Sequence, residues 1–157
     1  MNKDMALITG SGPARRVEVK RSIKAPIERV WRAITSAEEV SSWWQPAEIG
    51  SFEGGNVKVF FDAGGEPFVN GTVKVFQAPY VLEFTWNDAD DKPGLVRFDL
   101  VEESDGQTLV TLTQFVPETE ITPAAAGWHD IMDRLVRHIQ LGEAGPSQFS
   151  ELKELYE

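Results

Sequence analysis

The segment from Gly127 to Gln140, GWHDIMDRLVRHIQ, does most to decide which fold this sequence can adopt. Its large apolar side chains recur at i, i+4, i+7 and i+11, the spacing of one face of an α-helix. A long helix with one apolar stripe needs a second apolar surface to cover. The stripe consists of Trp128, Met132, Leu135 and Ile139.

Capping signals on both sides set the expected bounds of this helix. Thr122 followed by Pro123 is a typical helix start, and Gly142 is a typical stop. The pattern therefore predicts a helix from about Pro123 to Leu141.

Both histidines of the chain lie in the same segment. His129 and His138 are nine residues apart, which is about 13 Å along a helix axis, so one metal ion cannot bind both. Zinc sites on helices use histidines four residues apart. We therefore interpret both as packed flankers of the apolar stripe rather than as catalytic or metal-binding residues. The polar face is expected to carry exposed ion pairs among Asp130, Asp133, Arg134 and Arg137.

The chain before this helix begins with one strand and two short helices. Residues 16–24 alternate in polarity and predict a half-buried strand. Arg21 lies in register with its apolar residues and is expected to reach solvent from near the strand end, with a buried ion pair as the alternative. Residues 26–35 have helical apolar spacing after Pro26. Ser36 and Glu39 have the spacing of a capping box for a second short helix that ends near the two tryptophans at 43 and 44.

Residues 47–116 contain five or six short alternating segments separated by turns, without helical segments between them. This order indicates an antiparallel meander. The elements together predict an α+β fold, in which a curved antiparallel sheet of about six to seven strands wraps around the long C-terminal helix. We expect residues 1–14 to form a flexible leader, 15–143 the domain, and 144–157 a tail with a short amphipathic helix.

Composition excludes several classes of function. The net charge of -10 argues against a nucleic-acid partner, and the absence of cysteine excludes disulfides and thiolate chemistry. No apolar run approaches the roughly 20 residues of a membrane-spanning helix, and a cytoplasmic location is the expectation. Asp88, Asp90 and Asp91 lack the calcium-loop pattern and are expected to be solvated. No catalytic residue, metal site or cofactor is predicted.

Several short motifs, in their order, resemble a known family. The motifs are APIERVWRAIT (25–35), WW (43–44), NGTVKVFQAPYVLEFTW (70–86), LVTLTQ (109–114) and GWHDIMDRLVRHI (127–139). They resemble the activator-of-heat-shock-protein-90-ATPase-homologue-like family, which belongs to the START-like (SRPBCC) superfamily with the helix-grip fold. The resemblance covers about residues 16–142.

The resemblance implies a cavity between the long helix and the concave sheet face, and thus binding or carriage of a small hydrophobic molecule. Gln114 matches a position that is often polar and faces inward, so it could bond a ligand. Five tryptophans and nine phenylalanines could equally form a filled core, which periodicity cannot distinguish from a hollow one. The expected lining comprises Trp31, Trp43, Trp44, Phe61, Phe84, Trp86, Phe98, Leu112, Gln114, Trp128, Met132 and Leu135.

Two other functions stay open at this point. A chaperone-binding module is one, although the leader before residue 15 is too short for the extra N-terminal domain that such co-chaperones use. A cyclase-like or hydrolase-like enzyme is the other, although no acid–base pair or nucleophile motif is visible. The ligand and the oligomeric state are not predicted.

Overall fold

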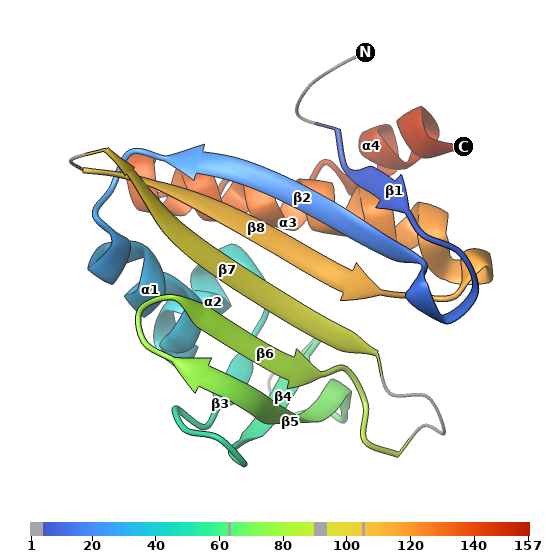
Figure 1. The fold of residues 1–157 in the computed structure, drawn as a ribbon, viewed down its shortest axis with the longest axis horizontal. Helices are drawn as coiled ribbons and strands as arrows, with labels where there is room; N and C mark the ends of the chain where they lie inside the picture. Colours follow the sequence, from blue (N-terminus) through green and yellow to red (C-terminus); the bar gives the residue numbers. More distant parts are fainter. Residues whose placement is uncertain (1–4, 63, 90–93, 105) are drawn as a thin grey trace.

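A long helix lies against the concave face of an eight-stranded antiparallel sheet in the computed structural model, which describes residues 5–62, 64–89, 94–104 and 106–157 (Figure 1). The strand order is β1-β2-β8-β7-β6-β5-β4-β3. The strands are β1 (Leu7–Thr9), β2 (Arg16–Ile23), β3 (Ala47–Ile49), β4 (Asn56–Phe60), β5 (Pro67–Gln77), β6 (Val81–Thr85), β7 (Leu95–Ser104) and β8 (Gln107–Phe115). The α-helices are α1 (Ile27–Thr35), α2 (Ala37–Trp43), α3 (Ile121–Leu141) and α4 (Phe149–Tyr156). Two short 3-10 turns span Gly12–Ala14 and Glu118–Glu120.

The α+β helix-grip class is confirmed, but the sheet has more strands than expected. The strand that the sequence did not predict is β1, which has only three residues, too few for alternation to be recognisable. β1 lies inside the segment expected to be a flexible leader, where Leu7 pairs with Glu18 of β2. That expectation is wrong for residues 7–9.

Local sequence accounts for the helices. In α1, Ile27, Val30 and Ile34 are buried on one face, as the helical spacing predicts. The expected capping box before α2 is wrong, because Ser36 makes no side-chain cap and Glu39 bonds to arginines of α1 instead. α3 ends at Gly142, whose φ of 80° is the left-handed conformation that favours glycine at a helix stop.

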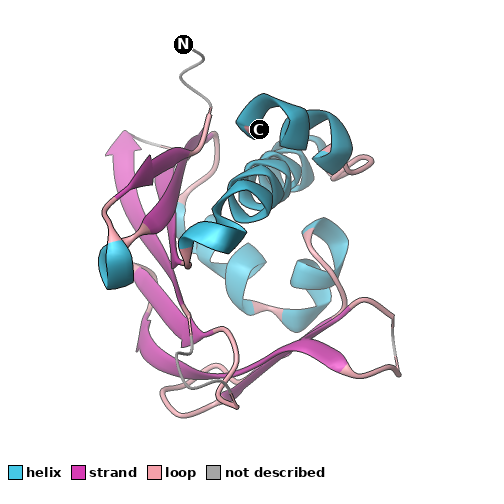
Figure 2. Cartoon of the chain, turned by 90° about the vertical axis from the view of Figure 1, so that its right-hand side faces the viewer, coloured by secondary structure: helices cyan, strands magenta, loops and turns pink. Residues whose placement is uncertain are grey.

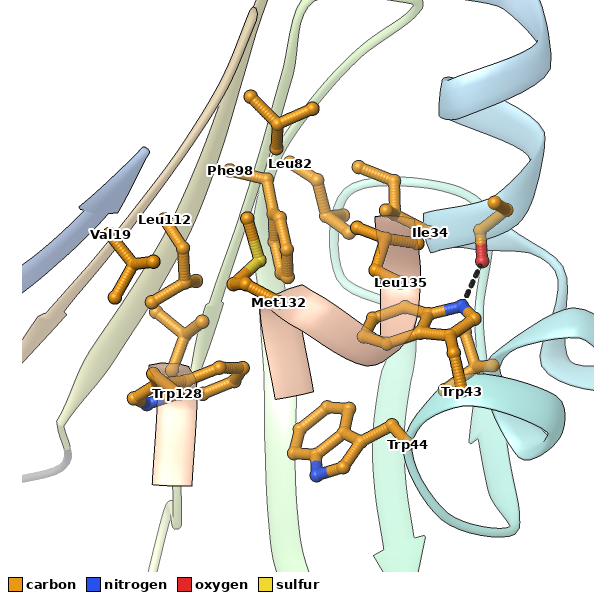
Figure 3. Close-up of a cluster of buried hydrophobic side chains, with 14 of the residues drawn as sticks. Val19, Ile34, Trp43, Trp44, Leu82, Phe98, Leu112, Trp128, Met132 and Leu135 are labelled. Atoms are coloured by element: carbon orange, nitrogen blue, oxygen red, sulfur yellow. Dashed lines mark hydrogen bonds between the residues drawn. The ribbon is translucent and has the colours of Figure 1, made fainter. Parts of the chain in front are cut away.

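The sheet bends around α3, with α1 and α2 on the same inner side (Figure 2). The apolar side chains of α3 and of the inner sheet face meet in a single core (Figure 3). Trp43, Phe98 and Leu112 are among its fully buried members, together with Met132 and Leu135 of α3. Among the residues described, no helix is long and apolar enough to cross a membrane.

Candidate functional site

Aromatic rings fill the middle of the space between α3 and the sheet. Trp128 of α3 is the centre of this cluster, and its ring centroid lies 5.2 Å from that of Trp44 and 6.3 Å from that of Phe98. Trp43 in turn packs edge-on against Phe98, with centroids 6.5 Å apart (Figure 3). These rings are in mutual contact, so most of the predicted lining packs against itself as core.

A pocket of about 380 Å³ opens at one end of this aromatic cluster. It lies between the N-terminal half of α3 and the end of β8, and it is open to solvent on one side. Three residues expected to line a cavity meet there: Trp86, Gln114 and Trp128. The remaining lining comes from Gly94, Phe115, Val116, Pro117, Glu120, Pro123, Ala124, Gly127 and Ile131.

Gln114 is the main polar side chain of this pocket. It alternates with the buried Val110 and Leu112 of β8, which places it on the inner sheet face, and it is 5% exposed. Its Oε1 accepts a hydrogen bond of 2.6 Å from the indole Nε1 of Trp128. Its Nε2 has no hydrogen-bond partner among the described residues. One amide group therefore ties the helix to the sheet and keeps a donor that no described residue uses.

The other residues expected to line a cavity lie elsewhere. Seven are buried in the core rather than at the pocket: Trp43, Trp44, Phe84, Phe98, Leu112, Met132 and Leu135. Trp31 is half-buried and packs edge-on against Phe76. Phe61 is 69% exposed, so its expected inward position is wrong. A register shift between Val59 and Phe60 ends β4 at Phe60, and the alternation does not continue.

Arg21 is buried, contrary to the expectation that it reaches solvent. Its side chain is 8% exposed, and its Nε donates to Asp133 Oδ1 at 2.8 Å. Asp133 also lies 3.3 Å from Nε2 of His129. The expected exposed ion pairs of α3 are therefore wrong for Asp133. They are also wrong for Asp130, which is buried and accepts hydrogen bonds from Ser147 and from the backbone of Gln148, just before α4.

Hydrogen-bond directions can be assigned through His129. The backbone N–H of Ala6 donates to the Tyr156 hydroxyl oxygen at 2.5 Å. Burial raises the pKa of Tyr156, so the hydroxyl keeps its proton and can donate it to Nδ1 of His129 at 2.8 Å. In the tautomer that accepts this proton at Nδ1, Nε2 of His129 carries the ring proton and lies 3.3 Å from Oδ2 of Asp133. Ala6, just before β1, and Tyr156 of α4 are thereby linked to α3 through His129.

His138 is also held in place by other side chains. Its Nε2 lies 2.9 Å from Oε1 of Glu39. The Glu39 carboxylate also accepts hydrogen bonds from Arg29 at Oε1 and from Arg32 at Oε2. Burial acts to raise the pKa of Glu39, but the hydrogen bonds from His138 and the two arginines outweigh it and hold the pKa below its ordinary value. The cluster joins α1, α2 and α3 outside the pocket.

The Asp133 cluster predicts a specific dependence of stability on pH. Burial acts to raise the pKa of Asp133, but its hydrogen bond with His129 and the charge of Arg21 outweigh burial and lower it. A carboxyl with a lowered folded-state pKa stabilises the fold above its unfolded pKa, about 3.9, and loses that contribution as the pH falls through the folded value. We expect Asp133→Asn to lower the free energy of unfolding more at pH 7 than at pH 3, measured by urea denaturation.

The matched control for this prediction is Asp62→Asn, because Asp62 is exposed in a turn. It should change stability little at either pH. An Asp133→Asn effect of equal size at pH 7 and pH 3 would contradict the assigned ion pair.

The acidic loop after β6 is described only in part. Asp88 accepts hydrogen bonds from the hydroxyls of Thr72 and Thr85, which lower its pKa, so it is tied to the sheet rather than simply solvated. Asp90 and Asp91 lie outside the described residues. Within the part of the chain that the structure describes, no three potential ligating side chains cluster around one metal position.

Comparison with known proteins agrees with this architecture. The family model described as activator of Hsp90 ATPase homolog 1-like protein matches residues 24–140. The chain belongs to this family. The resemblance inferred from the motifs is thus confirmed. A comparison with curated proteins found no match to the chain.

Solved structures similar to this family member share its fold. A conserved protein of unknown function from Enterococcus faecalis is 22% identical, with 96% of this chain and 87% of that one covered and a TM-score of 0.80. CalU16 from Micromonospora echinospora is 21% identical over 96% and 92%, with a TM-score of 0.75. An HSP90 activator from Plasmodium falciparum is 17% identical over 81% and 96%, with a TM-score of 0.65. At these identities the likeness concerns the fold alone.

Proposed function

We propose that this protein binds a small apolar molecule that carries a hydrogen-bond acceptor, in the pocket formed by Trp86, Gln114 and Trp128. The observation that supports this most directly is the Nε2 group of Gln114. It is a donor without a partner among the described residues, on a side chain that is nearly buried at the wall of an otherwise mainly apolar pocket.

The pocket has the chemistry of a small-molecule site. Its volume of about 380 Å³ lies near the lower end of the range of roughly 300–1,000 Å³ that ligand pockets occupy. Indole rings provide apolar faces, and a single oriented amide fixes the position of one polar atom of the ligand. A carbonyl, ether or hydroxyl oxygen on a flat or aliphatic skeleton fits this arrangement.

The lining also favours binding over acid–base catalysis. Among the described residues that line the pocket, the one side chain that titrates is Glu120, which is exposed at the rim. General acid–base chemistry needs a positioned group and usually a second group that orients it. Carriage or sensing of the ligand is therefore the form of function that we propose.

The test is a tryptophan-fluorescence titration with a panel of fatty acids, flavonoids and polyketide-like aromatics. For a compound that binds, Gln114→Leu should weaken binding by about tenfold, since a well-placed hydrogen bond contributes about 1 kcal/mol or somewhat more. Gln107→Leu is the matched control on the same strand, because Gln107 bonds to Glu103 outside the pocket. Equal effects of the two variants, or a panel without any binder, would refute the proposal.

A chaperone-binding module is the second candidate, because the family is named for activation of the Hsp90 ATPase. Binding to an Hsp90 chaperone from the same organism, measured with purified proteins, distinguishes the two. A chaperone-binding role predicts a complex that Gln114→Leu leaves intact and that apolar ligands do not displace.

A further inference from the structure

A second pocket, of about 480 Å³, lies where α3 passes the edge of β2. β1 pairs with β2 only as far as Glu18, so the following residues of β2 have no neighbouring strand on that side among the described residues. The pocket shares no lining residue with the pocket at Trp86. Its lining consists of Lys20, Arg21, Ser22, Leu109, Asp133, Val136 and Arg137.

The charge of this lining is opposite to that of the whole protein. Three cationic side chains, Lys20, Arg21 and Arg137, line the pocket with one carboxylate, Asp133. The whole chain has a net charge of -10. Two further carboxylates lie close by, because Glu18 lies 3.6 Å from Lys20 and Glu103 accepts a hydrogen bond from Ser22. Even so, the cations outnumber the carboxylate within the pocket itself, and such a patch concentrates small anions.

The two arginines retain donors that no described residue uses. Arg21 donates through Nε to Asp133 and through Nη1 to the carbonyl of Lys20, whereas its buried Nη2 has no partner. Arg137 is held by a hydrogen bond of 2.6 Å from its Nε to the carbonyl of Ala144. Its terminal nitrogens have no partner among the described residues. Both guanidinium groups are thus fixed while part of their hydrogen-bonding capacity remains unused.

We propose that this pocket binds a small oxyanion, the carboxylate or phosphate group of a free small molecule. Guanidinium groups match the planar, multidentate geometry of both oxyanions. Asp133 holds Arg21 through Nε, so the arginine is oriented before an anion arrives. Lys20, at the exposed rim, adds a third positive charge. The site is separate from the apolar pocket and does not depend on what that pocket binds.

The test is a ¹H–¹⁵N NMR titration with inorganic phosphate and with acetate, each compared with sodium chloride at matched ionic strength. We expect saturable shifts at the backbone amides of Arg21 and Ser22 and at the Nε–H groups of Arg21 and Arg137. Binding of either oxyanion supports the site, and the tighter one identifies its class. Shifts that sodium chloride reproduces, or that do not saturate, would overturn it.

Two variants that change the net charge of the protein equally distinguish binding at this pocket from a general electrostatic effect of the whole protein. Lys20→Gln should raise the dissociation constant of the oxyanion by about threefold, as expected for the loss of one partly exposed charge contact. Lys74→Gln, at an exposed position of β5 outside the pocket, makes the same change in net charge and should leave affinity unchanged. Equal weakening by both variants would overturn the proposal. Arg21→Lys should weaken binding by about tenfold. If Arg21→Lys does not fold, the comparison of Lys20→Gln with Lys74→Gln still tests the proposal.

Discussion

Replacing Gly71 with alanine is expected to lower the free energy of unfolding by about 3 kcal/mol or more, which urea denaturation followed by circular dichroism would measure. A Cβ atom at this position would lie 1.8 Å from the carbonyl oxygen of Thr85 and 2.7 Å from its carbonyl carbon. These are backbone atoms of β6, so the clash cannot be relieved by turning a side chain. Strands β5 and β6 would have to separate at their existing register shift near Val73.

Gly127→Ala is the matched control for this prediction. Gly127 lies within α3, and its nearest neighbour beyond the helix backbone, a ring carbon of Phe149, would be 3.9 Å from the new Cβ. Alanine should therefore stabilise the helix by about 0.5–1 kcal/mol. If Gly71→Ala is tolerated as well as Gly127→Ala, the close approach of β5 to β6 is wrong.

Trp43→Ala is expected to destabilise the protein by about 3–5 kcal/mol, the range for truncating a buried aromatic side chain. Trp43 is 1% exposed, and its ring packs against Trp44 and Phe98. Its indole Nε1 donates a hydrogen bond of 2.8 Å to the carbonyl of Ala33, which joins α2 to α1 (Figure 3). The variant therefore loses apolar contacts and a buried hydrogen bond together.

Phe61→Ala serves as the control for Trp43→Ala in the same denaturation experiment. Both residues were expected to line a cavity, whereas Phe61 is largely exposed and stacks on Phe68. Its truncation should change stability by about 0.5 kcal/mol or less. Similar losses for the two variants would contradict the assignment of Trp43 to the core.

Long periodic elements and their caps could be predicted from sequence. The stripe that contains Trp128 and Met132 located α3, and the end at Gly142 was correct because left-handed φ values select glycine. Its start was two residues late, since Ile121 precedes the expected first residue. Helix starts shift in this way when the flanking residues also tolerate helical backbone.

Interactions between distant elements could not be predicted in this way. Arg21 has an alternation position typical of a strand residue that faces the core, but its partner Asp133 is 112 residues later in the chain. The hydrogen bond between His129 and Tyr156 depends on where α4 packs, which no local pattern specifies. Each of these polar side chains was therefore assigned to the wrong surroundings or left without a partner.

The sequence predicted only three of the residues that line the pocket at Gln114, namely Trp86, Gln114 and Trp128. Alternation places Trp86, Gln114 and Trp128 on inner faces, but it cannot indicate whether the space beside them is filled. Packing decides that, because Trp44 and Phe98 occupy the middle of the space between α3 and the sheet, and the pocket beside Trp128 opens toward Pro117. Residues contributed by the segment between β8 and α3 have no periodic signal.

The most direct test of the central claim is a ¹H–¹⁵N NMR spectrum of the protein with and without a ligand identified by fluorescence. We expect the side-chain amide of Gln114 and the indole N–H groups of Trp86 and Trp128 to shift on binding, while the side-chain amide of Gln107 does not. A ligand that binds stoichiometrically and leaves the Gln114 amide unchanged would contradict it.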